Sequence, residues 1–287
     1  MTAGESAAGV AAEMPAGMAQ TLLDRAMAAA DAASELLLDR PADLVVESKS
    51  TATDAVTAMD RASEELLIGM LLAESPGDGV LGEEGGERLG SSGVRWVLDP
   101  LDGTVNYLYG LPEWAVSVAA QWHGRTVAGV VRAPALDRVW WAAAGDGAWS
   151  RMGTAEPTRL HVGRERRLSH ALAGTGFGYS AERRVRQGAL LADVIALLRD
   201  IRRPGAAAVD LCFVAGGEYD VYFEQGIQEW DRAAAALLVA EAGGRVDVLD
   251  GWDPDGSTLT LAANPQLLAS LRDLLVDAQS RRRSNPG

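Results

Sequence analysis

Cysteine and histidine are both scarce in this 287-residue chain, which has Cys212 as its one cysteine and only three histidines. A single cysteine can form neither an intrachain disulfide nor a thiolate zinc cluster. His123, His161 and His170 are scattered along the sequence, which argues against a histidine-rich metal site. Any metal ion bound by this chain is therefore expected to use oxygen ligands.

Positive charge is also in short supply, because 26 lysines and arginines face 40 aspartates and glutamates, for a formal net charge of −14. Proteins that bind nucleic acid through bulk charge need a basic face, so this balance argues against direct nucleic-acid binding. Lys49 is the single lysine among these cations. The arginines at 281–283 are interpreted as part of a solvated tail.

Long apolar runs are missing as well. No stretch approaches the roughly 18 uninterrupted apolar residues that mark a membrane span. The N-terminus lacks the charged segment followed by an apolar segment that is typical of a secretory signal. We therefore expect a cytoplasmic protein with no membrane partner.

The pattern that remains mixes helices with short strands. Apolar residues at helical spacing predict helices over 18–39, 58–74, 183–200, 206–216 and 231–242, and a last helix from 265 to about 278. β-rich runs between turn signals predict strands over 94–98, 115–121, 127–132, 138–142, 168–174, 219–223, 246–249 and 258–262. This mixture predicts an α+β layered protein in two halves, 18–150 and 151–278, with a flexible tail over 1–17 and a disordered tail over 279–287.

The most informative motif is the run Trp-Val-Leu-Asp-Pro-Leu-Asp-Gly-Thr over residues 96–104. A strand-like stretch leads into Asp99 and Asp102, where Pro100 fixes the turn and Gly103 lets the backbone fold back. Two carboxylates on one tight turn repel each other unless a cation lies between them, and Mg²⁺ takes oxygen ligands of this kind. The alternative is an ordinary surface turn.

Three further acidic elements accompany this motif. Glu83 lies in a Gly-Glu-Glu-Gly run over 82–85, where a solvated side chain is the alternative. Asp231 is placed at the start of an alanine-rich helix, which it could simply cap. Asp60 falls in the first turn of the second predicted helix, where a helix-dipole role is the alternative.

Taken together and in this order, the four elements resemble the inositol monophosphatase family of Mg²⁺-dependent, lithium-sensitive phosphatases. The matching segments are Lys-Ser-x-x-x-Asp-x-Val-Thr-x-x-Asp over 49–60, Gly-Glu-Glu-Gly over 82–85, Trp-Val-Leu-Asp-Pro-Leu-Asp-Gly-Thr-Val-Asn-Tyr over 96–107 and Trp-Asp at 230–231. Segments 174–179 and 202–211 are similar to the bacterial SuhB-type branch. The resemblance implies an αβαβα five-layered sandwich with mixed β-sheets, and a homodimer.

The resemblance also implies a role for each matching residue. Two to three Mg²⁺ ions would be held by Glu83, Asp99, the Leu101 carbonyl, Asp102 and Asp231, and Li⁺ would inhibit. The pair that orients and deprotonates the attacking water would be Thr104 and Asp60, with Lys49 near the metal and phosphate. Phosphate would meet the backbone of Gly103 and Thr104, and the substrate alcohol would meet Asp102, Ala207 and Glu224.

These roles agree with the chemistry of phosphate monoesters, whose slow hydrolysis requires charge to be neutralised on the entering and leaving oxygens. They imply a Mg²⁺-dependent phosphomonoesterase that hydrolyses myo-inositol 1-phosphate, a small phosphorylated polyol, by attack of a metal-activated water. Fructose-1,6-bisphosphate, histidinol phosphate, NADP(H) and 3′-phosphoadenosine phosphates are alternative substrates. SuhB-type relatives also resemble partners of the transcription antitermination machinery, so an interaction role stays open.

Two other enzyme classes are disfavoured. Phosphatases of the haloacid-dehalogenase kind use Asp-x-Asp-Gly-Thr, whereas two residues separate Asp99 and Asp102, and no lysine follows residue 49. Gly174, Gly176 and Gly178 resemble a fragment of a dinucleotide loop, but the acidic residue of such a unit is missing. We therefore expect no dinucleotide cofactor.

Overall fold

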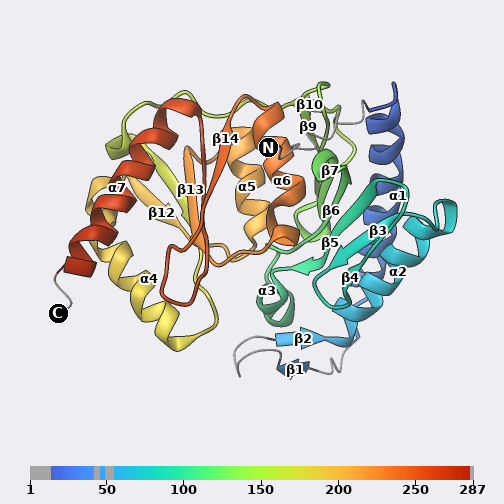
Figure 1. Cartoon of the computed structure of the whole chain (residues 1–287), viewed down its shortest axis with the longest axis horizontal. Helices are drawn as coiled ribbons and strands as arrows, with labels where there is room; N and C mark the ends of the chain where they lie inside the picture. Colours follow the sequence, from blue (N-terminus) through green and yellow to red (C-terminus); the bar gives the residue numbers. More distant parts are fainter. Residues whose placement is uncertain (1–13, 42–45, 49–54, 285–287) are drawn as a thin grey trace, which may run out of the picture.

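Two large β-sheets alternate with three layers of helices in the computed structural model, which describes residues 14–41, 46–48 and 55–284 (Figure 1). A separate two-stranded sheet is formed by β1 (Val46–Ser48) and β2 (Ala55–Thr57). The outer helices on one side are α1 (Met18–Leu38) and α2 (Ala58–Glu74), and those on the other side are α4 (Ala181–Val194) and α7 (Pro265–Ser284). Between the sheets lie α5 (Ala207–Gly216) and α6 (Glu229–Glu241). The predicted αβαβα sandwich is confirmed.

The first sheet has eight strands in the order β10-β9-β8-β7-β6-β5-β3-β4. Its strands are β3 (Gly79–Gly82), β4 (Gly86–Arg88), β5 (Val94–Asp102), β6 (Ala115–Trp122), β7 (Arg125–Ala133), β8 (Arg138–Ala143), β9 (Ala148–Met152) and β10 (Thr158–Arg159). Only β3 and β5 pair in parallel among these neighbours in the described chain, and the other pairs are antiparallel. The four strands predicted between residues 94 and 142 are confirmed as β5 to β8.

Small side chains let the helices lie close to this sheet. On α1, Ala26, Ala29 and Ala33 are fully buried, and the helix contacts β6, β7 and β8. On the opposite face, a Cβ atom on Gly129 of β7 would lie 2.9 Å from Cα of Ala234 in α6. Glycine is therefore required at this crossing, which holds α6 firmly against the sheet.

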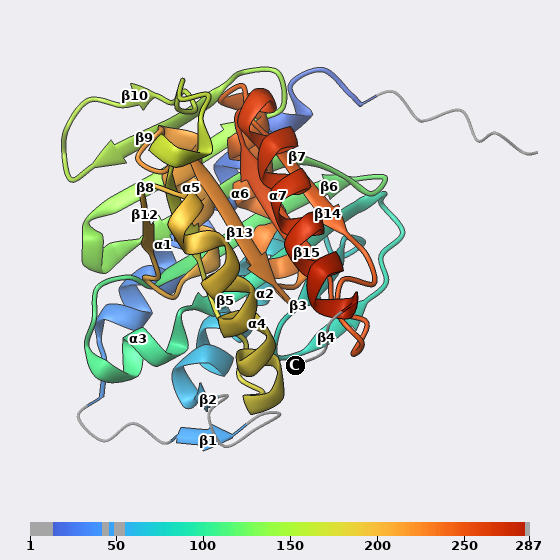
Figure 2. The ribbon, with the colours of Figure 1, turned by 90° about the vertical axis from the view of Figure 1, so that its left-hand side faces the viewer.

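The second sheet has five strands in the order β12-β11-β13-β15-β14 and is mixed, as predicted. Its strands are β11 (Leu172–Thr175), β12 (Asp200–Arg202), β13 (Val221–Gln225), β14 (Arg245–Leu249) and β15 (Leu259–Ala263). Neighbours of β11 run parallel to it, and the remaining pairs are antiparallel. Figure 2 shows α4 and α7 side by side over the outer face of this sheet, where they contact each other.

Two predicted elements of the second half have different boundaries. The helix predicted over 183–200 ends at Val194, and a 3₁₀ turn (Ile195–Leu197) then leads into β12. Leu198 is extended, and the amide of Arg199 donates to the carbonyl of Ala171, which draws the chain into the sheet. The strand predicted over 168–174 begins instead with a 3₁₀ turn, Leu168–His170.

The C-terminal helix is longer than predicted. We expected a tail from residue 279, but α7 continues to Ser284. Arg282 forms an ion pair with Asp193 of α4 at 2.6 Å, and the amide of Gln279 donates to the Trp252 carbonyl, so neighbouring elements support the extra turn. Residues 285–287 lie outside the described residues.

The remaining boundaries concern the tail and the two halves. Most of the tail predicted over 1–17 lies outside the described residues. Met14 is described, and it packs against the hydrophobic core between α1, α2 and the first sheet. The division at residue 150 stays a prediction, and β10 carries the first sheet on to Arg159. No helix in the described part of the chain has the length and apolar character needed to cross a membrane.

Candidate active site

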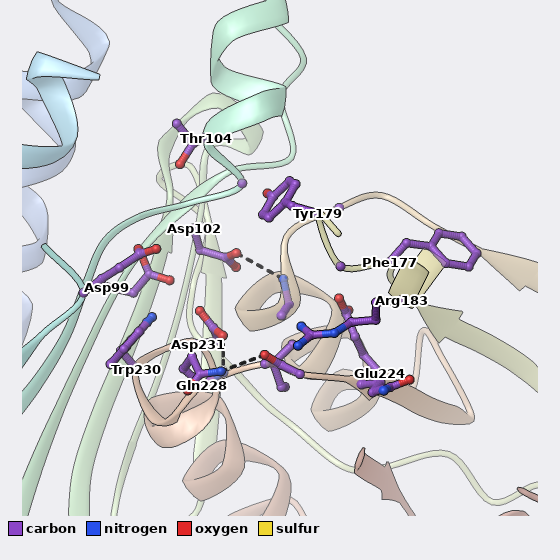
Figure 3. Close-up of a pocket in the computed structure, with 18 of the residues that line it drawn as sticks. Asp99, Asp102, Thr104, Phe177, Tyr179, Arg183, Glu224, Gln228, Trp230 and Asp231 are labelled. Carbon is purple, nitrogen blue, oxygen red and sulfur yellow. Dashed lines mark hydrogen bonds between the residues drawn. The ribbon is translucent and has the colours of Figure 1, made fainter. Parts of the chain in front are cut away.

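A cavity of about 480 Å³ opens where the end of β5, the start of α6 and the segments around α4 and α5 meet. The residues that line it include nine of the predicted site residues: Glu83, Asp99, Leu101, Asp102, Gly103, Thr104, Ala207, Glu224 and Asp231. These residues come from both halves of the chain, and Figure 3 shows the labelled side chains around the cavity. The sequence motifs therefore converge on one place.

The end of β5 turns its two aspartates toward this cavity. Pairing with β6 is interrupted between Asp99 and Asp102, where Pro100 has no N–H to give to a neighbouring strand. Gly103 has a φ of 85°, and a Cβ atom there would lie 2.8 Å from the carbonyl oxygen of Glu113. A larger residue would push the turn apart, so Gly103 fixes how the carboxylates are presented.

Asp102 also joins the two halves of the chain. Its carboxylate accepts hydrogen bonds from the backbone N–H groups of Ala207, at 3.2 Å, and Ala208, at 2.7 Å. Both amides belong to the first turn of α5, where N–H groups have no acceptor within the helix. Asp102 and Ala207, which are both predicted to contact the substrate, are thus hydrogen-bonded to each other.

Glu83 and Asp231 reach the cavity from a hairpin and a helix. Glu83 lies in the turn between β3 and β4. Asp231 is the third residue of α6, and its carboxylate accepts a hydrogen bond from the amide of Gln228, the N-cap. Asp231 is therefore not itself the N-cap, but it does help to cap this helix while lining the cavity.

Burial and mutual repulsion dominate the electrostatics of these acids. Burial raises the pKa of Asp99 well above its usual range, and the carboxylates of Glu83, Asp102 and Asp231 raise it further. Burial and then Asp231 likewise raise the pKa of Asp102. Buried carboxylates that repel one another are stabilised by a cation between them, and a hard divalent ion matches an all-oxygen donor set.

The carboxylates are close enough to repel one another but are not closed around a common point. Among the residues that the structure describes, no three His, Cys, Asp or Glu side chains are arranged as a ready-made metal cage. The donor chemistry fits a divalent cation, and the metal-ligand assignments stay predictions.

A buried hydrogen-bonded pair, Thr104 and Asp60, lies beside the acidic end of the cavity, by which we mean the part lined by Glu83, Asp99, Asp102 and Asp231. Thr104 Oγ1 is 3.0 Å from Oδ1 of Asp60 and 3.1 Å from the carbonyl oxygen of Leu101. The other carboxylate oxygen, Oδ2, accepts from the amide of Thr57 at 2.8 Å and from its hydroxyl at 2.6 Å. Both carboxylate oxygens of Asp60 are therefore hydrogen-bonded. Oδ2 helps to cap α2 through Thr57, while Oδ1 contacts Thr104.

An ion-pair network joins the hairpin of Glu83 to the start of α6. Arg95 of β5 donates to Glu87 of β4 at 3.1 Å and to Glu229, the first residue of α6, at 2.6 Å. Gln121 donates to the same Glu229 oxygen at 2.8 Å and accepts from Arg95. The Arg95 guanidinium therefore connects the β3–β4 hairpin, which carries Glu83, to α6, which carries Asp231.

Glu224 faces the cavity from the second sheet. Its carboxylate accepts a hydrogen bond of 2.7 Å from the hydroxyl of Tyr222, and burial raises its pKa to about 7. A Cβ atom on Gly176 would lie 2.1 Å from the Glu224 carboxylate. The glycines around 176 lie between β11 and α4 of a β-α-β unit, and at Gly176 the missing side chain makes room for this glutamate.

Several residues that line the cavity were not predicted from the sequence: Phe177, Tyr179, Arg183, Arg203, Gln228 and Trp230. Trp230 belongs to the Trp-Asp motif, but no site role was assigned to it. Only the SuhB-like segments, 174–179 and 202–211, pointed toward three of them. Lys49 lies outside the described residues, so its predicted place near the phosphate stays a prediction.

Comparison with known proteins decides what kind of site this is. The family model of the inositol monophosphatase family matches residues 18–281. The chain belongs to the inositol monophosphatase family. It is accordingly a phosphatase, and the haloacid-dehalogenase alternative is excluded.

Relatives of this family member have two kinds of names. It is 48% identical over 239 residues to the inositol-1-monophosphatase SuhB of Mycobacterium tuberculosis, covering 80% of this chain and 82% of that protein. It is 40% identical over 236 residues to the Nus factor SuhB of Pasteurella multocida, covering 81% and 86%.

Solved structures of the same family share the fold. The structure of Mycobacterium tuberculosis SuhB matches with a TM-score of 0.77 at 42% identity, covering 90% of this chain and 97% of that chain. The extragenic suppressor protein suhB from Bartonella henselae matches with a TM-score of 0.79 at 33% identity, covering 89% and 98%. The inositol monophosphatase fold therefore extends over nearly the whole chain.

Proposed function

We propose that this phosphatase hydrolyses myo-inositol 1-phosphate with Mg²⁺ as its cofactor. The observation that carries the proposal is the hydrogen bond between Thr104 and Asp60, which lies beside a cluster of carboxylates in one cavity. The relative from Mycobacterium tuberculosis named inositol-1-monophosphatase SuhB supports the substrate. The family's phosphatase chemistry supports the reaction type.

The residues of the acidic end fit a divalent cation. Mg²⁺ would be held by Glu83, Asp99, the carbonyl of Leu101, Asp102 and Asp231, all of which line the cavity. A bound ion would supply positive charge to the phosphate and acidify a water molecule. The raised pKa values of Asp99 and Asp102 support this assignment, because positive charge would relieve the repulsion that causes part of the shift.

Thr104 and Asp60 would then act on the water. The Thr104 hydroxyl donates to Oδ1 of Asp60, which leaves its oxygen lone pairs to accept a hydrogen bond from a water on the cavity side. Asp60 is able to take up the proton through this relay, and Thr57 holds it in position. Gly103 and Thr104 begin the short helix α3 (Thr104–Tyr109), so their N–H groups can meet phosphate oxygens.

Glu224 would bind the alcohol half of the substrate. Within the described residues its carboxylate accepts one hydrogen bond, from Tyr222, and so has acceptor positions left for hydroxyl groups. Such acceptors favour a polyol, since an apolar alcohol would leave them buried without a partner. Asp102 and Ala207 line the same cavity as Glu224, in keeping with their predicted role at the alcohol.

A phosphate-release panel tests this substrate. Purified protein with Mg²⁺ would be given myo-inositol 1-phosphate, fructose-1,6-bisphosphate, histidinol phosphate, NADP⁺ and a 3′-phosphoadenosine phosphate, with and without Li⁺. We expect the highest kcat/KM for myo-inositol 1-phosphate, with inhibition by Li⁺. A higher kcat/KM for another ester would reassign the substrate within the same reaction type.

A role as a transcription antitermination partner is the second candidate. It is supported by the Pasteurella multocida relative named Nus factor SuhB. Capture of RNA polymerase from a lysate by both the wild type and Asp99→Asn would support an interaction role that does not need the acidic cluster. The homodimer and the cytoplasmic location also stay predictions.

A further inference from the structure

The cavity wall away from the aspartates of β5 includes the first turn of α4, which the loop that leads into β15 supports through Asp255. Arg183, in the first turn of α4, lines the cavity and donates through Nε and Nη2 to Oδ2 of Asp255, at 3.1 and 3.0 Å. One turn further along, Arg186 pairs with Asp253, whose side chain is only 2% exposed. Asp255 therefore holds the guanidinium of Arg183 in place through its Nε and Nη2 atoms.

The third nitrogen of Arg183 has no such partner. In the described part of the chain, Nη1 donates to no protein acceptor. Two glycines surround it: a Cβ atom on Gly226 would lie 2.5 Å from Nη1, and one on Gly178 would lie 2.6 Å from Cδ. Figure 3 shows the side chain reaching across the cavity from the α4 side, between Asp231 and Glu224.

The charge of Arg183 is matched within the wall. Asp255 stays ionised at neutral pH, because a hydrogen bond from the Ser257 side chain and the contacts with Arg183 lower its pKa to about 2. Asp253 forms an ion pair with Arg186. A guanidinium already paired with a carboxylate offers directed N–H groups with little surplus positive charge, which suits a neutral hydroxyl better than a second phosphate.

We propose that Arg183 is a specificity-determining residue, whose Nη1 donates a hydrogen bond to a hydroxyl of the substrate alcohol while Glu224 accepts one from the same part of the molecule. The inference rests on the proposed hydrolysis of a phosphorylated polyol. An acceptor and a donor on neighbouring walls select groups that can both donate and accept, and hydroxyls do both. Arg183 thereby acts on substrate binding and not on the reacting phosphate.

The test compares two substrates in two Arg183 variants. The substrates are myo-inositol 1-phosphate and phenyl phosphate, whose leaving group has no hydroxyl beyond the ester oxygen. Arg183→Gln and Arg183→Lys should each raise KM for myo-inositol 1-phosphate about tenfold, with kcat within about twofold, the usual size of one lost charge-assisted hydrogen bond. KM for phenyl phosphate should stay unchanged in both variants.

Arg282→Gln is the matched control, because it removes an ion pair with Asp193 of α4, and neither residue lines the cavity. It should lower the unfolding temperature and leave both KM values unchanged. Arg183→Lys keeps a cation opposite Asp255, so a KM effect in this variant cannot be assigned to loss of that charge. Unfolding temperatures of all variants check that each protein is folded.

The outcomes separate the inference from the proposed function. Hydrolysis of phenyl phosphate but not of myo-inositol 1-phosphate by the wild type would overturn the proposed substrate, and the inference with it. Wild-type hydrolysis of both esters with unchanged KM in Arg183→Gln would overturn the inference alone. An equal KM increase for phenyl phosphate in Arg183→Gln would also overturn it, because Arg183 would then not act through the hydroxyls of the substrate alcohol.

Discussion

Thr104 Oγ1 lies 3.0 Å from Oδ1 of Asp60, although the two residues are 44 positions apart in the sequence. Thr104 opens a short helix after β5, and Asp60 belongs to the first turn of α2. The contact joins the outermost helical layer to the cavity. The Thr104 hydroxyl thus lies between the buried carboxylate of Asp60 and the acidic residues that line the cavity.

This relationship predicts that the Thr104 hydroxyl is needed for the chemical step. Thr104→Val keeps the shape of the side chain but removes the hydroxyl, and we expect kcat to fall by about 10²–10⁴-fold, the usual contribution of general acid–base catalysis. Thr175→Val is the matched control, because Thr175 is a buried threonine that donates to the carbonyl of Phe223 and does not line the cavity. Equal kcat values in the two variants would contradict the relay.

Neutralising one buried acid should stabilise the metal-free protein. In Asp99→Asn, a buried carboxylate repelled by three others becomes an uncharged amide. We expect a higher unfolding temperature in EDTA than for the wild type, and a smaller rise on adding Mg²⁺. Asp146→Asn, at an exposed aspartate, should change neither quantity.

Thermal unfolding with and without Mg²⁺ makes this comparison directly. The cation assignment would be wrong if Mg²⁺ raised the unfolding temperature of Asp99→Asn by as much as that of the wild type.

Glu224 predicts a specific pH dependence of stability. Its folded-state pKa is about 7, against a usual value of 4.5, so the folded protein retains a proton that the unfolded chain has lost within that window. Folding stability should therefore decrease as pH rises from 4.5 to 7. Glu224→Gln should remove this loss and be about 1–3 kcal/mol more stable than the wild type at pH 8, with a smaller difference at pH 5.

Urea unfolding in EDTA at the two pH values measures this difference. Glu182→Gln, at an exposed glutamate of α4, is the control and should show no pH-dependent change relative to the wild type. A Glu224→Gln advantage of the same size at both pH values would argue against the raised pKa.

Arg95 should act on metal affinity more than on turnover. It ties Glu87, on the hairpin that carries Glu83, to Glu229, two residues before Asp231. Arg95→Gln would loosen both elements, and we expect Mg²⁺ affinity to fall about tenfold, the lower end of the loss typical of residues that support metal ligands, with kcat at saturating Mg²⁺ nearly unchanged.

Calorimetric titration with Mg²⁺ measures this affinity without turnover. Arg125→Gln, at an exposed arginine at the start of β7, should bind Mg²⁺ like the wild type. Unaltered affinity in Arg95→Gln would show that the network plays no part in metal binding.

The sequence predicted the elements whose pattern is local. Helical spacing of apolar residues identified α1 and α2, and Asp99 and Asp102 were found because Pro100 and Gly103 give the turn a distinctive sequence. Strands β1 to β4, β9, β10 and β12 were missed, since each has five residues or fewer and little alternation. Their pairing depends on neighbouring strands and not on their own residues.

The acidic site was predicted better than the wall opposite it. Glu83, Asp102 and Asp231 belong to recognisable motifs, whereas Arg183 gains its place from Asp255, 72 residues away, and from Gly226. No spacing rule marks a residue defined by such long-range contacts. The end of α7 was misjudged for the same reason, because Asp193 of α4 supports Arg282.

Phosphate release from myo-inositol 1-phosphate, measured over a Mg²⁺ titration for the wild type and Asp99→Asn, tests the central claim most directly. The account predicts saturable, Mg²⁺-dependent release by the wild type, abolished by EDTA, and little release by Asp99→Asn at any Mg²⁺ concentration. Wild-type release that persists in EDTA, or no release at saturating Mg²⁺, would contradict the claim that this carboxylate cluster supports metal-dependent hydrolysis of that ester.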